Sequence, residues 1–190
     1  MENTELIFAT LVSRIFDPFI FFVIAIIVAA IRSGMTEDAL LYFIAACILF
    51  IIVPPVTMLV WAVHSKRVSD WDVSQRGQRV WVFLVFSILL IVDYIVIKVF
   101  GNFALETLFI SFIVWFIGFF VITFFWKISG HVAGLTLVLG LFWVWYGARV
   151  APFFIFVPLL AWARVVTKNH TLAQVTGGFF YSLALLLFIQ

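Results

Sequence analysis

Long apolar runs, each near the length needed to cross a bilayer, dominate this sequence. Residues 107–126, for example, contain no Asp, Glu, Lys or Arg. A helix needs roughly 20 apolar residues to cross the hydrocarbon core. Only 11% of the 190 residues are charged and 66% are hydrophobic, whereas a soluble domain carries about 25% charged residues. These values exclude a soluble enzyme, a disordered tail and a small disulfide-stapled domain, and they predict an integral, multi-pass membrane protein.

The apolar runs predict an all-α fold, a polytopic transmembrane helical bundle of six core helices with a seventh at the N-terminus. The expected core spans are residues 39–63, 80–97, 107–126, 132–148, 150–169 and 171–190. The N-terminal helix is expected at residues 15–31, tilted because Asp17-Pro18 shortens its uncharged stretch, with residues 6–16 along the membrane interface. Pro54-Pro55 is expected to kink the second helix. The whole chain, 1–190, is expected to form one membrane-integrated domain.

The polar residues concentrate in alternate connections. Counting the N-terminal helix as the first, the connections after the second, fourth and sixth helices carry seven of the eleven bases and all three histidines. Two crossings return the chain to its starting side, so segments 66–79, 127–131 and 163–178 lie on one face of the membrane. Positive-inside loops and snorkelling bases produce a similar bias without any site. The positive-inside rule favours a cytoplasmic face, but it counts the same bases that the site would use, so the side stays open.

The first polar segment contains Asp72, Arg76 and Arg79 ahead of the third helix. If this segment is helical, the three side chains share one face through i+4 and i+3 spacing. Two guanidinium groups could then bind phosphate oxygens bidentately, with Asp72 orienting one of them. A solvated Asp–Arg helix start is the alternative.

The second polar segment contains Lys127, Ser129, Gly130 and His131. A Ser-Gly turn that leads into a helix presents backbone N–H groups and the positive end of the helix dipole, which together suit an anion. Lys127 adds a positive charge, and His131 could protonate a leaving oxygen. A helix cap followed by an interfacial histidine is the alternative.

The third polar segment contains Arg164 at the end of the sixth helix and His170 at the start of the seventh, with Gln174 one turn later. A histidine can attack phosphorus through one ring nitrogen when an acceptor holds the N–H of the other. Gln174 is spaced to be that acceptor. A structural histidine at a helix start is the alternative, and the pairing with Arg164 favours a phosphate site.

With these three segments, the sequence resembles the type 2 phosphatidic acid phosphatase superfamily of membrane lipid phosphatases. Ser129-Gly130-His131 is similar to the second motif of that family. The third motif of that family is an Arg, five residues, a His, three residues and an Asp. The present sequence is similar to it, with Arg164, His170 and Gln174 at the same spacing and Gln in the last position. The segment with Arg79 stands in the place of the first motif. The resemblance covers residues 66–178 and implies a helical bundle with a phosphate pocket at one membrane interface.

The resemblance also implies roles for single residues. His170 matches the nucleophile that forms a phosphohistidine, and His131 matches the general acid. Arg164 and Arg79 match the phosphate-binding arginines, and Ser129 with the Gly130 backbone would hold phosphate oxygens. Arg76 and Lys127 are added to the phosphate-binding set by position and charge, with Asp72 in support.

Three positions differ from the family pattern. Gln174 replaces the acid that would orient His170 and stabilise its imidazolium; it can accept a hydrogen bond but carries no charge. Ile128 replaces the proline usual before Ser-Gly-His, and the first motif lacks the family's lysine-to-arginine spacing. The corresponding acid-to-amide change in a serine protease lowers turnover by about 10⁴.

The leading hypothesis is an integral membrane lipid phosphatase that hydrolyses an isoprenyl phosphate or diphosphate, or a phosphatidic acid-like lipid, through a phosphohistidine. It needs no metal or cofactor, because fixed cations stabilise the transferring phosphoryl group. A net charge of +2 gives no reason to expect nucleic acid as a partner. The alternatives are a weak or inactive relative that binds or moves anionic lipids, and a lipid phosphotransferase. Asp93, inside the third helix, is a further functional candidate, with a structural partner or simple protonation as the alternatives.

Overall fold

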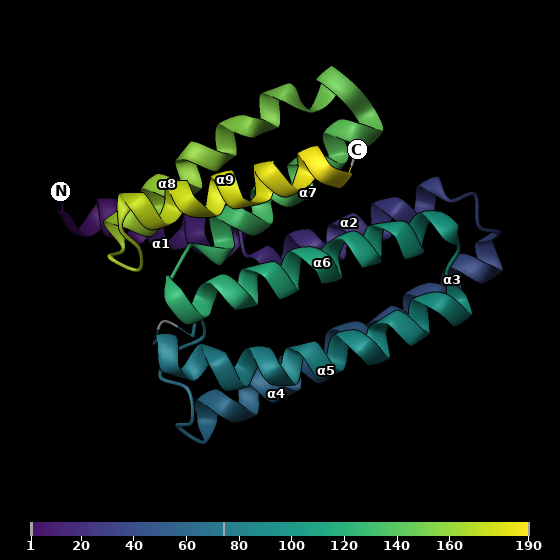
Figure 1. Ribbon diagram of the computed structural model, residues 1–190, viewed down its shortest axis with the longest axis horizontal. Helices are drawn as coiled ribbons and strands as arrows, with labels where there is room; N and C mark the ends of the chain where they lie inside the picture. The colour runs from purple at the N-terminus through teal and green to yellow at the C-terminus, as the bar shows by residue number, and fades with distance from the viewer. Residues whose placement is uncertain (1, 74, 190) are drawn as a thin grey trace. The chain divides into compact units, whose positions relative to one another are not determined.

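Helices account for the fold of this chain (Figure 1). The computed structural model describes residues 2–73 and 75–189, and within these residues it contains no β-strand. The elements are α1 (Glu2–Ile15), α2 (Pro18–Arg32), α3 (Glu37–Ala46), the π-helical η1 (Cys47–Ile52), α4 (Val53–His64), α5 (Arg76–Phe100), α6 (Phe103–Phe125), α7 (Gly130–Tyr146), the 3₁₀-helical η2 (Gly147–Ile155), α8 (Phe156–Val166) and α9 (Leu172–Ile189). The expected all-α fold of apolar helices is confirmed.

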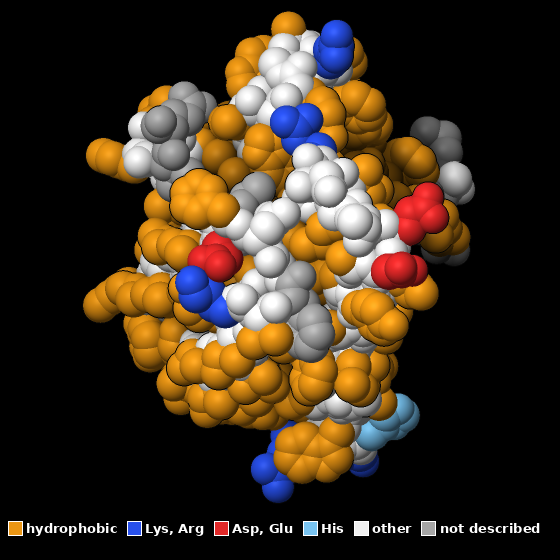
Figure 2. Space-filling model, turned by 90° about the vertical axis from the view of Figure 1, so that its right-hand side faces the viewer, with side chains coloured by type: hydrophobic (Ala, Val, Ile, Leu, Met, Phe, Trp, Pro, Cys, Tyr) orange, Lys and Arg blue, Asp and Glu red, His pale blue; other side chains and the backbone are white. Residues whose placement is uncertain are grey.

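Five helical segments among the described residues are long and apolar enough to cross a membrane. They are Thr4–Arg32, Glu37–His64, Arg76–Val99, Leu105–Phe125 and Gly130–Val166, and Leu172–Phe188 is a shorter apolar helix. Hydrophobic side chains cover most of the face drawn in Figure 2, with charged groups few and scattered. Such a surface is compatible with lipid rather than with water as its surroundings.

The N-terminal apolar run is two helices separated by a break at Phe16 and Asp17. Pro18 occupies the first position of α2, where a missing N–H costs nothing, and Asp17 Oδ1 accepts the Phe19 N–H at 2.9 Å. The α1 helix is buried at Ala9 and Val12, in the same apolar cluster as residues of α8. Residues 6–16 are therefore a packed helix and not only an interfacial strip.

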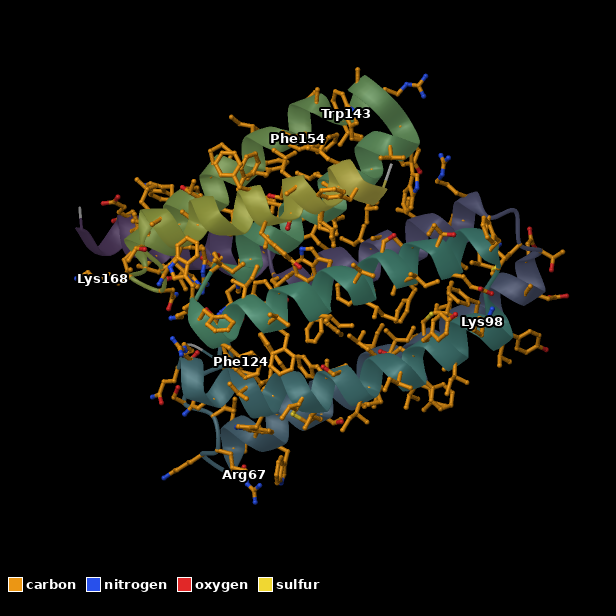
Figure 3. The ribbon with its side chains drawn as sticks, in the orientation of Figure 1. Arg67, Lys98, Phe124, Trp143, Phe154 and Lys168 are labelled. Carbon is orange, nitrogen blue, oxygen red and sulfur yellow. The ribbon has the colours of Figure 1, made fainter. Side chains whose placement is uncertain are left out.

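The run from α7 to α8 reverses direction in η2. The turn begins at Gly147, whose φ of 62° is a conformation that glycine adopts without a Cβ penalty. After the turn, Phe154 of η2 contacts Trp143 of α7 edge to face, with ring centroids 6.1 Å apart. Figure 3 labels both side chains where they meet. This hairpin corresponds to the two expected spans at residues 132–148 and 150–169.

The chain divides into two compact units. Unit 1 is Met1–Ala25 with Trp126–Gln190, and unit 2 is Ile26–Phe125. In unit 1, small residues let α7 and α9 approach closely: a Cβ on Gly178 would lie 2.6 Å from the Ser129 carbonyl oxygen. The buried Ser182 hydroxyl donates to the Ala133 carbonyl across the same contact at 2.7 Å. Close backbone approach with hydroxyl bridges is the usual way to join helices in an apolar solvent.

In unit 2, the helix between residues 37 and 64 is irregular in its middle. At the end of η1, the Val53 N–H bonds to the Ile48 carbonyl in an i→i−5 turn. Pro54 and Pro55 follow at once and carry no N–H, so they cannot continue a regular α-helical ladder. A π-helical turn therefore stands just before Pro54-Pro55, where a kink was expected.

Candidate functional site

Two of the three predicted polar segments are joined in unit 1. The Lys127 ammonium group donates to the Asn169 carbonyl at 3.0 Å, and the Ser129 N–H donates to the Gln174 carbonyl at 3.0 Å. The first bond links the connection before α7 to the connection before α9, and the second links it to the first turn of α9. The absence of a side chain at Gly178 allows this approach. The segments 127–131 and 163–178 thus form one site at the beginnings of two adjacent helices.

His170 is held by the side chain of Gln174. Its Nδ1 lies 3.2 Å from Gln174 Oε1, and the imidazole is only 5% exposed. The same amide oxygen accepts the backbone N–H of Thr171 at 3.1 Å. A backbone N–H can only donate, so it fixes which end of the Gln174 amide faces His170. His170 Nδ1 is then the protonated nitrogen, and Nε2 carries the lone pair.

Thr171 and Gln174 form a capping box at the start of α9. The Gln174 N–H donates to the Thr171 hydroxyl at 3.3 Å, and the Gln174 side chain returns to the Thr171 N–H, which is the reciprocal pattern of such a box. The Thr-x-x-Gln spacing in the sequence is the pattern from which this cap could have been predicted. Because α9 begins at Leu172, His170 lies just before the helix, where the sequence interpretation had it opening the helix.

Arg164 lies in the last turn of α8 and is 1% exposed. Its carbonyl oxygen accepts the His170 N–H at 3.1 Å, so the turn between α8 and α9 brings the two residues together. Within that turn Lys168 adopts a φ of 57° and extends outward (Figure 3). A guanidinium buried to this degree is costly unless partners surround it.

Ser129 is the N-cap of α7. Its hydroxyl accepts the Val132 N–H at 3.4 Å, and its side chain is fully buried. The capping alternative for this serine is therefore realised in the structure. Gly130 is the first residue of α7 and His131 the second, so both lie at the positive end of the helix dipole.

Asp17 is a site residue that the sequence interpretation missed. Its Oδ2 lies 3.8 Å from Nε2 of His131, an ion pair when the imidazole is protonated. The start of α2 can approach α7 this closely because Gly134 has no side chain: a Cβ there would lie 2.8 Å from the Pro18 Cβ. The sequence signal for this residue was the Asp17-Pro18 break inside an apolar run. The sequence interpretation used that break only to explain why the first span is short.

The first predicted segment lies in unit 2, and it is not helical at Asp72, so the condition for a shared helical face is not met. The α5 helix begins only at Arg76. Asp72 precedes it in a turn, where its N–H bonds to Asp70 Oδ1 at 3.0 Å. Val73, with a φ of 48°, keeps this turn from joining the helix, because a left-handed β-branched residue interrupts a helical path.

The two arginines of that segment also differ from each other. Arg79 is buried, and its Nε donates to the Val73 carbonyl at 2.8 Å. Arg76 is exposed, and its guanidinium donates to the Phe125 carbonyl at 3.3 Å. The first turn of α5 therefore does not present two equivalent guanidinium groups to one anion.

An apolar cavity of about 440 Å³ lies within unit 1, along α7, η2 and α9. Thr136, Gly140 and Trp143 line it from one face of α7, and Ala151 and Phe154 line it from η2. The volume is in the range of small-molecule sites. Its walls carry few polar groups, which suits a hydrocarbon chain.

Comparison with protein-family models, curated proteins and solved structures finds no match to this chain. Among the described residues, no cluster of three or more His, Cys, Asp or Glu side chains is placed to hold a metal ion.

Proposed function

We propose that this chain is an integral membrane lipid phosphatase that removes a terminal phosphate through a phosphohistidine at His170. The observation that carries the proposal is the hydrogen bond between His170 Nδ1 and Gln174 Oε1. It directs the Nε2 lone pair toward a phosphorus atom as nucleophile. Nothing in the proposal requires a metal, because fixed cations stabilise the charge on the transferring phosphoryl group.

The cations of unit 1 support this chemistry. Arg164 supplies a buried guanidinium, which can bind two phosphate oxygens at once. Lys127 lies on the connection that is tied to the His170 turn, and the start of α7 at Gly130 adds backbone N–H donors. Arg79 and Arg76 of unit 2 remain proposed phosphate ligands on the strength of the family resemblance and their charge.

His131 is the proposed general acid. In the first step the bond from His170 Nε2 to phosphorus forms and the bond from phosphorus to the lipid oxygen breaks. The electron pair stays on that oxygen, which takes a proton from the His131 imidazolium. Water then attacks phosphorus and gives a proton back to His131, and the phosphorus–nitrogen bond breaks to release phosphate and free His170. The Asp17 carboxylate stabilises the imidazolium form.

The proposed substrates are an isoprenyl phosphate or diphosphate and a phosphatidic acid-like lipid. The apolar cavity along α7 is a candidate place for part of the hydrocarbon chain. The largely apolar surface of the spans would admit such a substrate from the bilayer.

The test is phosphate release from a panel of lipid phosphates by the purified protein, with a chelator present. Wild type should release phosphate and form an acid-labile phosphohistidine, whereas His170→Ala should lose both. His64→Ala is the matched control, because His64 is exposed at the end of α4 in the other unit. Undiminished release by His170→Ala would contradict the mechanism.

A second candidate function is binding or movement of anionic lipids without turnover. It is favoured by the capping box, which gives the uncharged Gln174 a structural reason to be present. This candidate predicts saturable binding of lipid phosphate with no phosphate release, and a gain of turnover in Gln174→Asp. A phosphotransferase would use the same pocket and differ by passing the phosphoryl group to a lipid alcohol in place of water.

A further inference from the structure

A buried carboxyl group lies in unit 2, apart from the residues proposed for phosphate chemistry. Asp93 is 4% exposed and lies inside the candidate span Arg76–Val99. Its Oδ1 atom has no hydrogen-bond partner among the residues that the structure describes. An ionised carboxylate is costly in such a place unless a cation or several donors surround it. Intramembrane carboxyl groups are accordingly rare, and they often take part in proton relays.

The irregular turn η1 packs against α5, the helix that carries Asp93. Cys47, the first residue of η1, is buried. Single π-helical turns inside α-helices are frequently found at functional sites. Pro54 and Pro55 carry no N–H, so carbonyl groups of the preceding turn lose their helical donors. Asp93 thus lies on a helix that packs against an irregular turn of the neighbouring helical segment.

The elements around Asp93 provide no close cation among their described residues. Lys98, the nearest base along α5, is bonded to Glu106 of α6 at 2.8 Å. The other titratable side chains on α3, η1, α4 and the second half of α5 are Glu37, Asp38, Tyr42, Cys47, His64 and Tyr94. Apart from Lys98 and His64, the titratable side chains of these elements are carboxyl, thiol or phenol groups, and an ionised carboxylate buried without a cation is costly.

We infer that Asp93 is a proton-binding site in the membrane-spanning part of unit 2, held as a carboxylic acid on the helix that packs against the π-helical turn η1. The proton is carried on the carboxyl oxygen and leaves to water with its electron pair remaining on the carboxylate. The site is independent of the lipid phosphatase proposal, because Asp93 is none of the residues proposed for phosphate chemistry.

An apolar carbodiimide is a direct probe of such a group. Dicyclohexylcarbodiimide takes the acid proton on nitrogen, bonds through its central carbon to the carboxyl oxygen and rearranges to a stable N-acylurea. The purified full-length protein should gain the mass of one intact reagent near neutral pH, and peptide mapping should place it at Asp93. Asp93→Asn should remove the label, whereas Asp38→Asn, at an exposed acid of α3, should keep it.

An infrared spectrum supplies a second readout that needs no reagent. Wild type should show a carboxylic-acid C=O stretching band near neutral pH, and this band should shift when aspartate is labelled with ¹³C at the carboxyl carbon. The wild-type spectrum and the wild-type labelled peptide test the inference even if Asp93→Asn fails to fold. Absence of the acid band, labelling at a different carboxyl, or protection of Asp93 by sodium ions would overturn the proton-binding assignment.

Discussion

Nδ1 of His170 lies 3.2 Å from Oε1 of Gln174, the same oxygen that accepts the Thr171 N–H. This one amide oxygen therefore completes the capping box of α9 and also fixes the tautomer of His170. In a serine protease, by contrast, an acid in the corresponding position also stabilises the imidazolium by its charge. Gln174 can provide the orientation without the charge, and substitutions at this position separate the two effects.

Gln174→Ala should lower both stability and turnover. The loss of the capping box should cost about 0.5–2 kcal/mol of unfolding free energy, and the His170 ring should lose its orientation. Gln174→Glu should keep the box, complement the helix dipole and raise turnover by about tenfold or more, because it restores the missing charge. Thermal unfolding in detergent and phosphate release from one lipid would measure the pair. Equal turnover in both variants would contradict the role of Gln174.

Asp17→Asn should lower turnover by an amount that depends on the leaving group of the substrate. An alkyl lipid phosphate needs protonation of its leaving oxygen, so its turnover should fall by about tenfold or more. An aryl phosphate with an acidic phenol needs little protonation and should change much less. Initial rates on both substrates provide the comparison, with Asp38→Asn as the control. A uniform loss on both would instead indicate that Asp17 acts through the Phe19 cap.

Gly178→Ala should destabilise unit 1. The added Cβ would meet the Ser129 carbonyl oxygen at 2.6 Å, and a backbone atom cannot move aside without disturbing α7. Overpacking of this kind costs about 1–3 kcal/mol. Gly77→Ala is the matched control, because a Cβ there meets nothing within 4 Å. The midpoint of thermal unfolding should fall for the first variant and stay or rise for the second.

Ala151→Trp should alter chain-length preference. Ala151 lines the apolar cavity and is itself exposed, so a large side chain can fill the space without unfolding the core. Turnover of long-chain lipid phosphates should fall relative to short-chain ones. Ile155→Trp, at an exposed position of the same η2 element that does not line the cavity, should leave the ratio unchanged. An unchanged ratio in both variants would place the hydrocarbon chain elsewhere.

Much of the fold could be predicted from the sequence, because the patterns that indicate each helix are local. Apolar runs of the length needed to cross a membrane predicted the helices, whereas the π-helical turn η1 just before Pro54-Pro55, where a kink was expected, is seen only in the structure. The predicted Arg164–His170–Gln174 spacing is also local, since a short turn and one helical step separate these residues. The condition for a shared helical face of Asp72, Arg76 and Arg79 is not met, because Val73 takes a left-handed conformation, which a residue pattern of this kind does not reveal.

The sequence by itself determined that the chain is an apolar all-α protein and that its polar residues fall in three separated segments, because both depend on composition and spacing along the chain. Only the tertiary structure decided which of these residues meet. The contacts of Asp17 with His131 and of Lys127 with Asn169 join residues far apart in the chain. The packing of whole helices sets such contacts, and that packing depends on where small residues let backbones approach.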